Sequence, residues 1–264
     1  MNKLIVLIPH FNNISDLKKT LNSIQENIKI DVLIVDDGSE IKPDLSDLLS
    51  HFSNSGNLSL EILKSNLGIE KALNFGLSLI QTLNYDFIGR LDCGDLARKG
   101  KFEKQINYLE KHPTIYLLGS WANIVTETYD YIYTLKHPCL YHEIKRKMYY
   151  NNCFVHPSVV FRSKVLETVG FYPEDRKYAE DFAYFFKIVE KHKVENLPEP
   201  LIDYVIAENS ISTTKRHEQI SSRIQIIKDH FYFGFHPIIG LIRNQILKFV
   251  SRNTVIKIKK SLNR

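Results

Sequence analysis

The sequence predicts an α/β fold with a mostly parallel central sheet that is flanked by helices. Short apolar runs with the length of buried strands are one sign of this fold, at residues 4–8, 31–35, 58–63 and 85–91. Apolar residues at helical spacing are the other sign, at residues 15–24, 66–83 and 101–111. Strands that alternate with helices imply right-handed βαβ units and therefore parallel pairing.

The first strand and the first helix come from the opening residues. Residues 4–8 are continuously apolar, as expected for a parallel strand that is covered on both faces. This run is too short for the core of a signal peptide, and it lacks a small-residue cleavage site. Ser15 and Asp16 predict the cap of the helix that follows. The apolar stripe of that helix is Leu17, Leu21 and Ile24.

The second half of the chain changes character. Residues 116–133 are rich in aromatic and β-branched residues with polar breaks, and the run at 154–161 is interrupted by Pro157. Residues 179–191 predict an amphipathic helix. Beyond a boundary near residues 210–230, we expect a basic, amphipathic helical extension over residues 221–264.

The composition is that of a soluble globular protein. The chain has 264 residues, 44% of them hydrophobic and 25% charged, which is enough for a sizeable core. From His230 onward it has seven Lys or Arg and no acid, so the preceding residues carry a net charge of about −2. This distribution argues against a nucleic-acid binder. The chain has no charge-free stretch of the length that a membrane span needs.

The cysteines point to a reducing compartment. Cys93, Cys139 and Cys153 are an odd, scattered set without CxxC spacing. They indicate neither a disulfide framework nor a zinc site, and a cytosolic location is expected.

Acidic residues follow two of the predicted strands and open a helix. Asp36 and Asp37 come directly after residues 31–35, and Gly38 permits a tight turn there. Carboxylates at the C-terminal ends of strands in an open α/β sheet face the crevice where ligands bind. They suit a divalent cation, hydrogen bonds from a sugar or base, or proton transfer. A plain turn with solvated carboxylates is the alternative.

The second and third acidic groups also have two interpretations each. Asp92 and Asp95 are three residues apart on a turn, and Mg²⁺ or Mn²⁺ prefers such oxygen ligands. The alternative is that Asp95 caps a helix and Asp92 is exposed. Glu180 and Asp181 open the aromatic helix, where they either stabilise its dipole or act as a general base.

A loop-to-helix junction at residues 66–76 combines glycine with amide side chains. Free N–H groups and the helix dipole favour an anion there, and Lys71 adds a positive charge. Helix capping explains much of the same pattern.

The order and spacing of these motifs resemble the family 2 glycosyltransferases with a GT-A fold, especially the bacterial enzymes that build lipopolysaccharide outer core or capsule. That fold has a Rossmann-like sheet. The resemblance spans roughly residues 3–212. Its motifs lie at residues 6–12, 34–39, 66–76, 90–95, 102–105, 118–120, 156–158 and 179–181.

For the donor, the resemblance implies a nucleotide-sugar-binding half at residues 1–120 of a single GT-A domain. Asp37 would contact the uracil and ribose of a UDP-sugar, with Asp36 beside it, and Pro9 and Phe11 would shape the base pocket. The full donor-binding set implied is Pro9, Phe11, Asn12, Asp36, Asp37, Asn66, Gly68, Lys71, Asn74, Arg90 and Asp92.

The resemblance also implies a divalent cation, Mn²⁺ or Mg²⁺, held by Asp92 and Asp95. The chain departs from the family here, because the common motif is Asp-Ala-Asp-Asp and the third position is Gly94. That change removes a carboxylate from the usual ligand site. A second departure is Leu73, where many relatives carry Arg, which leaves Lys71 as the local cation.

For the acceptor, the resemblance implies a binding half at residues 121–220 that includes His156 and Ser158. A histidine of this kind is otherwise more often structural than catalytic. Asp181, helped by Glu180, would deprotonate the acceptor hydroxyl, which attacks the anomeric carbon opposite the departing UDP. The anomeric configuration is then inverted.

We therefore expect an inverting hexosyltransferase that uses UDP-glucose or UDP-galactose and a lipopolysaccharide, lipooligosaccharide or capsule acceptor, either a glycolipid or an oligosaccharide. A sugar nucleotidyltransferase is an alternative, but residues 9–13 lack the Gly-rich, basic loop that it would need. A non-catalytic nucleotide- or carbohydrate-binding module is another.

The expected location is the cytoplasm, with peripheral contact to the inner face of the membrane through residues 236–264. Apolar residues alternate there with Arg243, Lys248 and Arg252, and such a segment is attracted to anionic lipid. The alternative is an ordinary helix that packs on the body of the protein.

Overall fold

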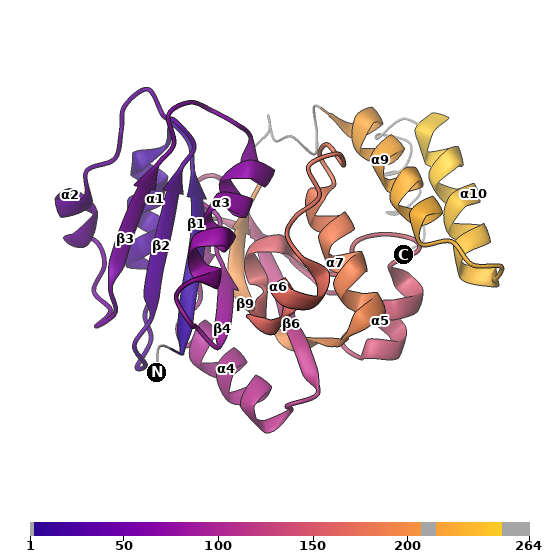
Figure 1. Cartoon of the computed structure of the whole chain (residues 1–264), viewed down its shortest axis with the longest axis horizontal. Helices are drawn as coiled ribbons and strands as arrows, with labels where there is room; N and C mark the ends of the chain where they lie inside the picture. Colours follow the sequence, from indigo (N-terminus) through magenta and orange to yellow (C-terminus); the bar gives the residue numbers. More distant parts are fainter. Residues whose placement is uncertain (1–2, 207–214, 250–264) are drawn as a thin grey trace.

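One mixed sheet runs through the computed structural model, which describes residues 3–206 and 215–249 (Figure 1). Its strands, in spatial order, are β3 (Leu58–Ile62), β2 (Asp31–Asp36), β1 (Leu4–His10), β4 (Phe87–Arg90), β8 (Val160–Arg162), β6 (Ile115–Val125), β9 (Lys193–Val205) and β5 (Leu96–Ala97). A ninth strand, β7 (Tyr131–Leu135), pairs with β6. The predicted α/β class is confirmed.

The two halves of the sheet differ in strand direction. β3, β2, β1 and β4 are parallel neighbours, and these are the four strands that the apolar runs predict. β8 is antiparallel to both β4 and β6, whereas β6 and β9 are parallel. The strand order reverses beside β1, where an α/β sheet opens its ligand crevice.

Helices cover both faces of this sheet. Those that the sequence predicts are α1 (Ile14–Asn22), α3 (Ile69–Gln81), α4 (Lys101–Lys111) and α7 (Glu180–Lys191). Four further elements are the short helices α2 (Leu45–Leu49), α5 (Tyr141–Lys147) and α6 (Lys164–Val169) and the 3₁₀ turn η1 (His156–Ser158).

The cap of α1 differs from the expectation. The capping side chain is that of Asn13, whose Oδ1 accepts a hydrogen bond from the Asp16 N–H at 3.2 Å. The helix therefore begins at Ile14, ahead of the predicted Ser15 and Asp16. Asp16 lies in the first turn instead, where its negative charge suits the helix dipole.

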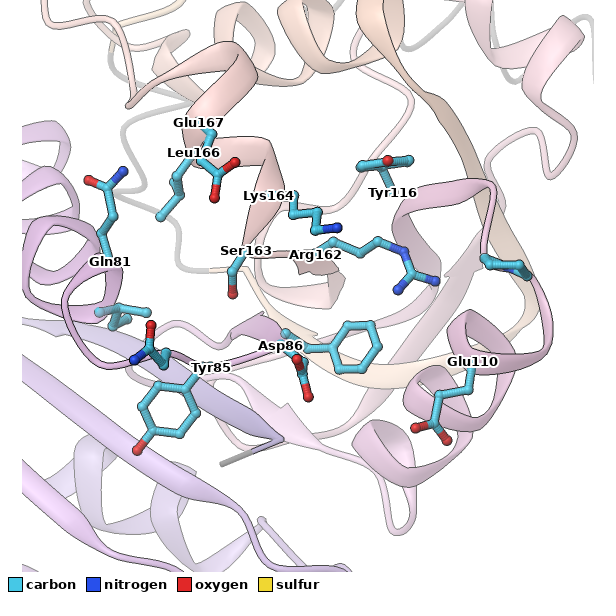
Figure 2. Close-up of a pocket in the computed structure, with 14 residues that line it drawn as sticks. Gln81, Tyr85, Asp86, Glu110, Tyr116, Arg162, Ser163, Lys164, Leu166 and Glu167 are labelled. Atoms are coloured by element: carbon cyan, nitrogen blue, oxygen red, sulfur yellow. The ribbon is translucent and has the colours of Figure 1, made fainter. Parts of the chain in front are cut away.

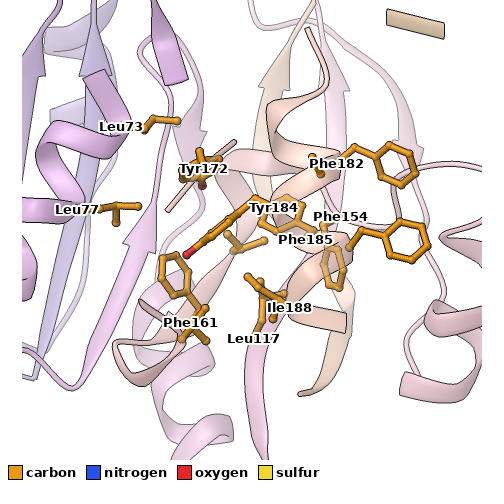
Figure 3. Packing of buried hydrophobic residues seen from close by; sticks show 14 of the residues in the cluster. Leu73, Leu77, Leu117, Phe154, Phe161, Tyr172, Phe182, Tyr184, Phe185 and Ile188 are labelled. Atoms are coloured by element: carbon orange, nitrogen blue, oxygen red, sulfur yellow. The ribbon is translucent and has the colours of Figure 1, made fainter. Parts of the chain in front are cut away.

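The core lies on both sides of the sheet. Alternate residues of β1 point to opposite faces, so Ile5 and Leu7 belong to one apolar cluster and Val6 to the other. Figure 3 shows how the first cluster joins the two halves of the chain, because Tyr172 and Tyr184 of α7 lie between the α3 residues Leu73 and Leu77 and the other aromatic side chains of α7. The rings of these two tyrosines are 4.2 Å apart.

A helix pair, α9 (Arg216–Asp229) and α10 (Phe235–Phe249), ends the described chain on the side away from β3 (Figure 1). Ile226 and Ile227 of α9 are buried in the first apolar cluster. A Cβ on Gly240 of α10 would lie 2.1 Å from the Tyr149 carbonyl oxygen, so this helix packs directly on backbone. The pair thus packs against the body and begins at Arg216, whereas residues 250–264 of the predicted extension lie outside the described residues.

Within residues 3–206 and 215–249, no helix is both long enough and apolar enough to cross a membrane.

Candidate active site

Asp36 holds two loops together at the ends of β1 and β2. Its buried carboxylate accepts hydrogen bonds from His10 Nδ1 at 2.7 Å, from Ser39 Oγ at 2.5 Å and from the Ser39 N–H at 3.0 Å. The other imidazole nitrogen, His10 Nε2, accepts from the Asn13 N–H, so the ring proton lies on Nδ1. Asp36 therefore has no free surface of its own in this arrangement.

Asp37 is bound to the loop that precedes α3. Its two carboxylate oxygens accept hydrogen bonds from the N–H groups of Leu67 and Gly68, at 2.8 and 2.9 Å. The anion that this helix start holds is therefore a side chain of the protein itself. The turn after Asp37 requires glycine at position 38. Gly38 has φ +71°, and a Cβ added there would lie 2.3 Å from the Ser65 carbonyl carbon.

The remaining donor-side residues divide into exposed and internally bonded groups. Phe11, Asn66 and Lys71 are exposed, Gly68 caps α3, and Pro9 is half-buried. Asn12 ties its loop to residues 38–40, because its N–H donates to Ser39 Oγ and its Oδ1 accepts from the Glu40 N–H.

Asn74 of α3 is paired with the backbone of Tyr172. Its Nδ2 donates to the Tyr172 carbonyl oxygen, and its Oδ1 accepts from the Tyr172 N–H, both at 2.9 Å. This amide therefore joins the donor half of the chain to the segment that leads into α7.

The turn after β4 separates its two acids. Arg90 is fully buried and donates from Nη1 to the Leu7 carbonyl oxygen at 2.6 Å and from Nη2 to Asp92 Oδ1 at 2.5 Å. Asp92 is partly exposed, whereas Asp95 is buried and accepts from the Val205 N–H at 2.8 Å. Burial, and then the charge of Asp92, raise the pKa of Asp95 well above its usual value.

This turn fits a cation only in part. In the described ranges, no group of three His, Cys, Asp or Glu side chains could hold a metal ion. Asp92 offers one accessible carboxylate, which suits Mg²⁺ or Mn²⁺ when substrate phosphates and water complete the coordination. Gly94 has φ +100°, so a residue with a side chain would be strained at that position.

A cavity of about 520 Å³ gathers acids from both halves of the chain. Gly68 and Asp92 come from residues 1–120, the predicted donor half, and His156, Glu180 and Asp181 come from the half that follows. The rest of the lining is Ile69, Glu70, Lys177, Tyr178, Tyr204 and Gln219. The structure therefore unites five of the residues that the sequence predicts.

Ser158 lies outside this lining. It is fully buried, and its hydroxyl donates to the Val155 carbonyl oxygen at 2.8 Å. Its hydroxyl also faces the backbone of Ser120, at 3.3 Å from the amide nitrogen. The predicted acceptor-side contact is therefore not direct, since this side chain packs between β6 and η1.

The acids at the start of α7 differ in their contacts. Asp181 Oδ2 accepts from Asn152 Nδ2 at 2.8 Å, and its Oδ1 lies 2.6 Å from the Phe182 nitrogen. Burial, and then the neighbouring Asp181, raise the pKa of Glu180 to about 8. Glu180 therefore holds a proton at neutral pH, and Asp181 is the oriented carboxylate of the pair.

His156 is held as a neutral imidazole. Its Nε2 lies 2.8 Å from the Tyr172 hydroxyl and 3.4 Å from Arg90 Nε, both of which can donate to it. Burial, and then the charge of Arg90, lower the pKa of His156 to about 4. The histidine thus links Arg90, and through it Asp92, to the segment before α7.

Three residues of the site had no signal in the sequence. Asn152 orients Asp181, Tyr172 bonds His156, and Tyr204 lines the cavity from β9. Each is a single polar or aromatic residue outside the motifs, so only the tertiary fold brings it to the acids.

A larger cavity of about 810 Å³ lies at the opposite end of β4 (Figure 2). It contains none of the predicted site residues. Arg162 in its wall already donates from Nε to the Ile115 carbonyl oxygen and from Nη2 to that of Leu109. Although this cavity is larger, we do not consider it the active site, because it lacks the predicted site residues and its Arg162 is already bonded to backbone.

Comparisons with known proteins bear on the family and the fold of this chain. Residues 5–170 match the family model described as glycosyl transferase family 2. The chain is 27% identical over 215 residues to the amylovoran biosynthesis glycosyltransferase AmsE of Erwinia amylovora, which covers 81% of this chain and 79% of that protein.

A second relative and a solved structure extend the likeness. The UDP-Gal:alpha-D-GlcNAc-diphosphoundecaprenol beta-1,3-galactosyltransferase of Escherichia coli is 26% identical, covering 82% of this chain and 77% of that protein. The crystal structure of S. aureus TarS 1–349 in complex with UDP-GlcNAc has a TM-score of 0.65 at 18% identity, over 90% of this chain and 70% of that one. That structure supports the fold, which is the GT-A type expected.

Proposed function

This chain belongs to glycosyl transferase family 2, and we propose that it transfers a hexose from a UDP-sugar to a glycolipid or oligosaccharide acceptor. The product would be part of a bacterial lipopolysaccharide, lipooligosaccharide or capsule. UDP-glucose and UDP-galactose are the favoured donors. The names of the Erwinia and E. coli relatives support a polysaccharide role and a UDP-sugar donor.

The observation that carries the proposal is the cavity in which Asp92 meets Glu180 and Asp181. Asp92 comes from the end of a parallel strand, where a nucleotide phosphate is expected. The other two acids come from the start of α7, in the half proposed to bind the acceptor. Donor and acceptor would therefore meet between these carboxylates.

On the donor side, we assign the base to the exposed surface around Phe11, Asn12 and Pro9. Each oxygen of Asp37 keeps a second lone pair for the uracil and ribose, and Asp36 fixes the loop beside it. Asn66, Gly68 and Lys71 would face the nucleotide from the start of α3. Asn74 and Arg90 support this surface from beneath through their contacts with Tyr172 and Asp92.

A divalent cation, Mn²⁺ or Mg²⁺, would be held by Asp92 together with the donor diphosphate. When bound, it would offset the negative charge that develops on the departing UDP. Asp95, buried behind Asp92, would keep the turn in shape through its bond to the Val205 N–H. This arrangement suits a metal motif in which glycine occupies the third position.

Proton transfer is assigned to Asp181. As a general base it would accept the proton of the acceptor hydroxyl while that oxygen attacks the anomeric carbon opposite UDP, which inverts the configuration. Asn152 would position the carboxylate through its 2.8 Å hydrogen bond. The proton on Glu180 would keep a second negative charge away from the donor diphosphate. His156, neutral and facing the cavity, would contact the acceptor.

The proposed location is the cytoplasm, with peripheral contact to the inner membrane face through residues 236–264. The described part of this segment supports the contact, because Ile238, Ile242, Ile246 and Phe249 are exposed at helical spacing on α10. The chain from His230 onward has no acid to oppose an anionic surface.

A labelled transfer assay tests the function. The protein is incubated with each of several labelled UDP-hexoses and a lipid extract of the encoding bacterium, with Mn²⁺ or with chelator. We expect transfer of label to lipid and release of UDP from one donor, and loss of both with chelator. Release of pyrophosphate would support the nucleotidyltransferase, and UDP-sugar binding without any transfer would support the binding module. Full activity in chelator would remove only the metal assignment.

A further inference from the structure

A third cavity, of about 830 Å³, lies beside the C-terminal half of α7. Its lining comes from α5, from Phe186 and Glu190 of α7, and from the turn between α9 and α10. At 1.5 Å of rise per residue, Phe186 is only about 7–8 Å along the helix from Asp181. The cavity is therefore separate from the acids of the candidate active site but close to them.

The inner wall of this cavity is aromatic. The ring of Tyr149 meets that of Phe186 edge-on at 5.0 Å and that of Tyr232 at 5.6 Å. Phe186 in turn stacks on His230 at 4.3 Å. Because these rings pack on one another, the wall is a fixed surface with apolar faces.

The rim of the cavity carries two basic side chains, and one of them, Lys145, lies over the ring of Tyr141 at 5.7 Å. Lys145 and Arg146 of α5 are exposed, and no salt bridge joins either of them to a carboxylate within the described ranges. The two acids in the lining each have a partner, because Glu190 Oε1 lies 2.8 Å from His230 Nδ1 and Asp229 forms an ion pair with Arg176 at 2.7 Å. An anion at this rim would meet two cations, one of which can bind phosphate in bidentate fashion.

The cavity opens beside an exposed apolar turn. Phe233 is 96% exposed, and Phe231 and Phe235 are also exposed on the same turn. Segments that enter the lipid headgroup region typically combine exposed aromatic residues with nearby basic residues.

We propose that this cavity binds the phosphate group of a membrane lipid. Lys145 and Arg146 contact the phosphate, the wall of Tyr149 and Tyr232 contacts the first carbons of the lipid, and the turn around Phe233 enters the bilayer surface. The proposal rests on the membrane contact put forward above. To that contact it adds a specific site for a lipid headgroup, whose inner wall includes Phe186 from the same helix as Asp181.

Vesicle sedimentation tests the site. The full-length protein is spun with vesicles of phosphatidylcholine alone or of phosphatidylcholine with phosphatidylglycerol, whose phosphate carries the net charge. We expect binding to the anionic vesicles, and a roughly 25-fold lower affinity for Lys145→Ala/Arg146→Ala, at about fivefold for each basic residue lost. Tyr232→Ala keeps every charge and should still weaken binding about threefold or more, because it removes part of the wall.

Lys111→Ala/Lys164→Ala is the matched control, since it removes two exposed lysines that are absent from the proposed site, and Lys164 lines the cavity of Figure 2 instead. Equal losses in the two double variants, or unchanged binding by Lys145→Ala/Arg146→Ala, would overturn the proposal. So would displacement of the vesicles by an equal concentration of inorganic phosphate, which would indicate a site for a free anion. Protection of all variants by UDP against thermal unfolding reports separately on the donor site, so its failure would count only against the proposed function.

Discussion

Asp36 with Asp37 and Glu180 with Asp181 are both pairs of adjacent acids, and their surroundings differ. The first pair accepts hydrogen bonds from His10, Ser39, Leu67 and Gly68, and both of its carboxylates are buried. The second pair lines an open cavity and includes a carboxyl group that stays protonated at neutral pH.

The difference shows what adjacent acids can do in one fold. Where backbone N–H groups surround a carboxylate, its negative charge strengthens the hydrogen bonds that hold the loops in place. Where two acids share a partly apolar site with few donors, one of them keeps its proton and the other can take one. We therefore propose that the first pair holds the loops and positions the donor, and that the second pair carries out the chemistry.

Removal of Asp37 should have the largest effect on stability. Asp37→Ala leaves the N–H groups of Leu67 and Gly68 without their acceptor, which we expect to lower the free energy of unfolding by about 3–5 kcal/mol. Denaturant titration measures it. Asp181→Ala is the matched variant and should change stability by less than about 1 kcal/mol. Equal losses of unfolding free energy in the two variants would contradict the structural role assigned to Asp37.

The pH dependence of stability should come from the other pair. The pKa of about 8 for folded Glu180 exceeds its ordinary 4.5, so the proton favours the folded protein. That contribution is complete below pH 4.5 and is lost as the pH rises through 8. Relative to Glu180→Gln, the wild type should lose on the order of 4 kcal/mol between about pH 5 and pH 9. A constant difference across that range would contradict the assignment.

Asn152→Ala should separate positioning from folding. Loss of its hydrogen bond to Asp181 is expected to lower kcat/KM about tenfold, with the melting temperature nearly unchanged. Steady-state kinetics with the identified donor measure the change. Asn152→Gln keeps an amide on a longer side chain and should recover part of the rate. If Asn152 has only a structural role, the melting temperature should fall together with the rate.

Gly94→Ala should have the smallest effect. The positive φ of 100° strains any side chain there, although a Cβ would meet only Asp16 at 3.9 Å. We expect about 1–2 kcal/mol of destabilisation and weaker UDP binding in the presence of Mn²⁺. Calorimetry measures UDP binding by Gly94→Ala with and without Mn²⁺. Binding as tight as that of the wild type would show that Gly94 has no role in the donor site.

The sequence was most informative where a single strand or helix determines the outcome. Continuous apolar runs predict β1 to β4, since a strand buried on both faces has that pattern. Of the acids that follow these strands, Asp92 lines the cavity, whereas Asp36, Asp37 and Asp95 are buried. β9 was missed because its residues alternate irregularly around Pro198 and Pro200, and α5 and α6 because they are short.

Contacts between distant segments could not be predicted in the same way. The bonds of Asn74 to Tyr172 and of Asn152 to Asp181 link residues that are 98 and 29 positions apart. The burial of Ser158 likewise depends on β6, which packs beside it. The spacing of residues along the chain contains no information about these distances.

The most direct test is the rate of hexose transfer by Asp181→Asn, measured on protein whose UDP binding and melting temperature match those of the wild type. Asparagine keeps the shape of the side chain and removes its basicity. The account predicts a loss of about 10²–10⁴-fold, the range of general-base catalysis. Transfer at the wild-type rate would show that Asp181 is not the base, and would remove the difference between the two acidic pairs.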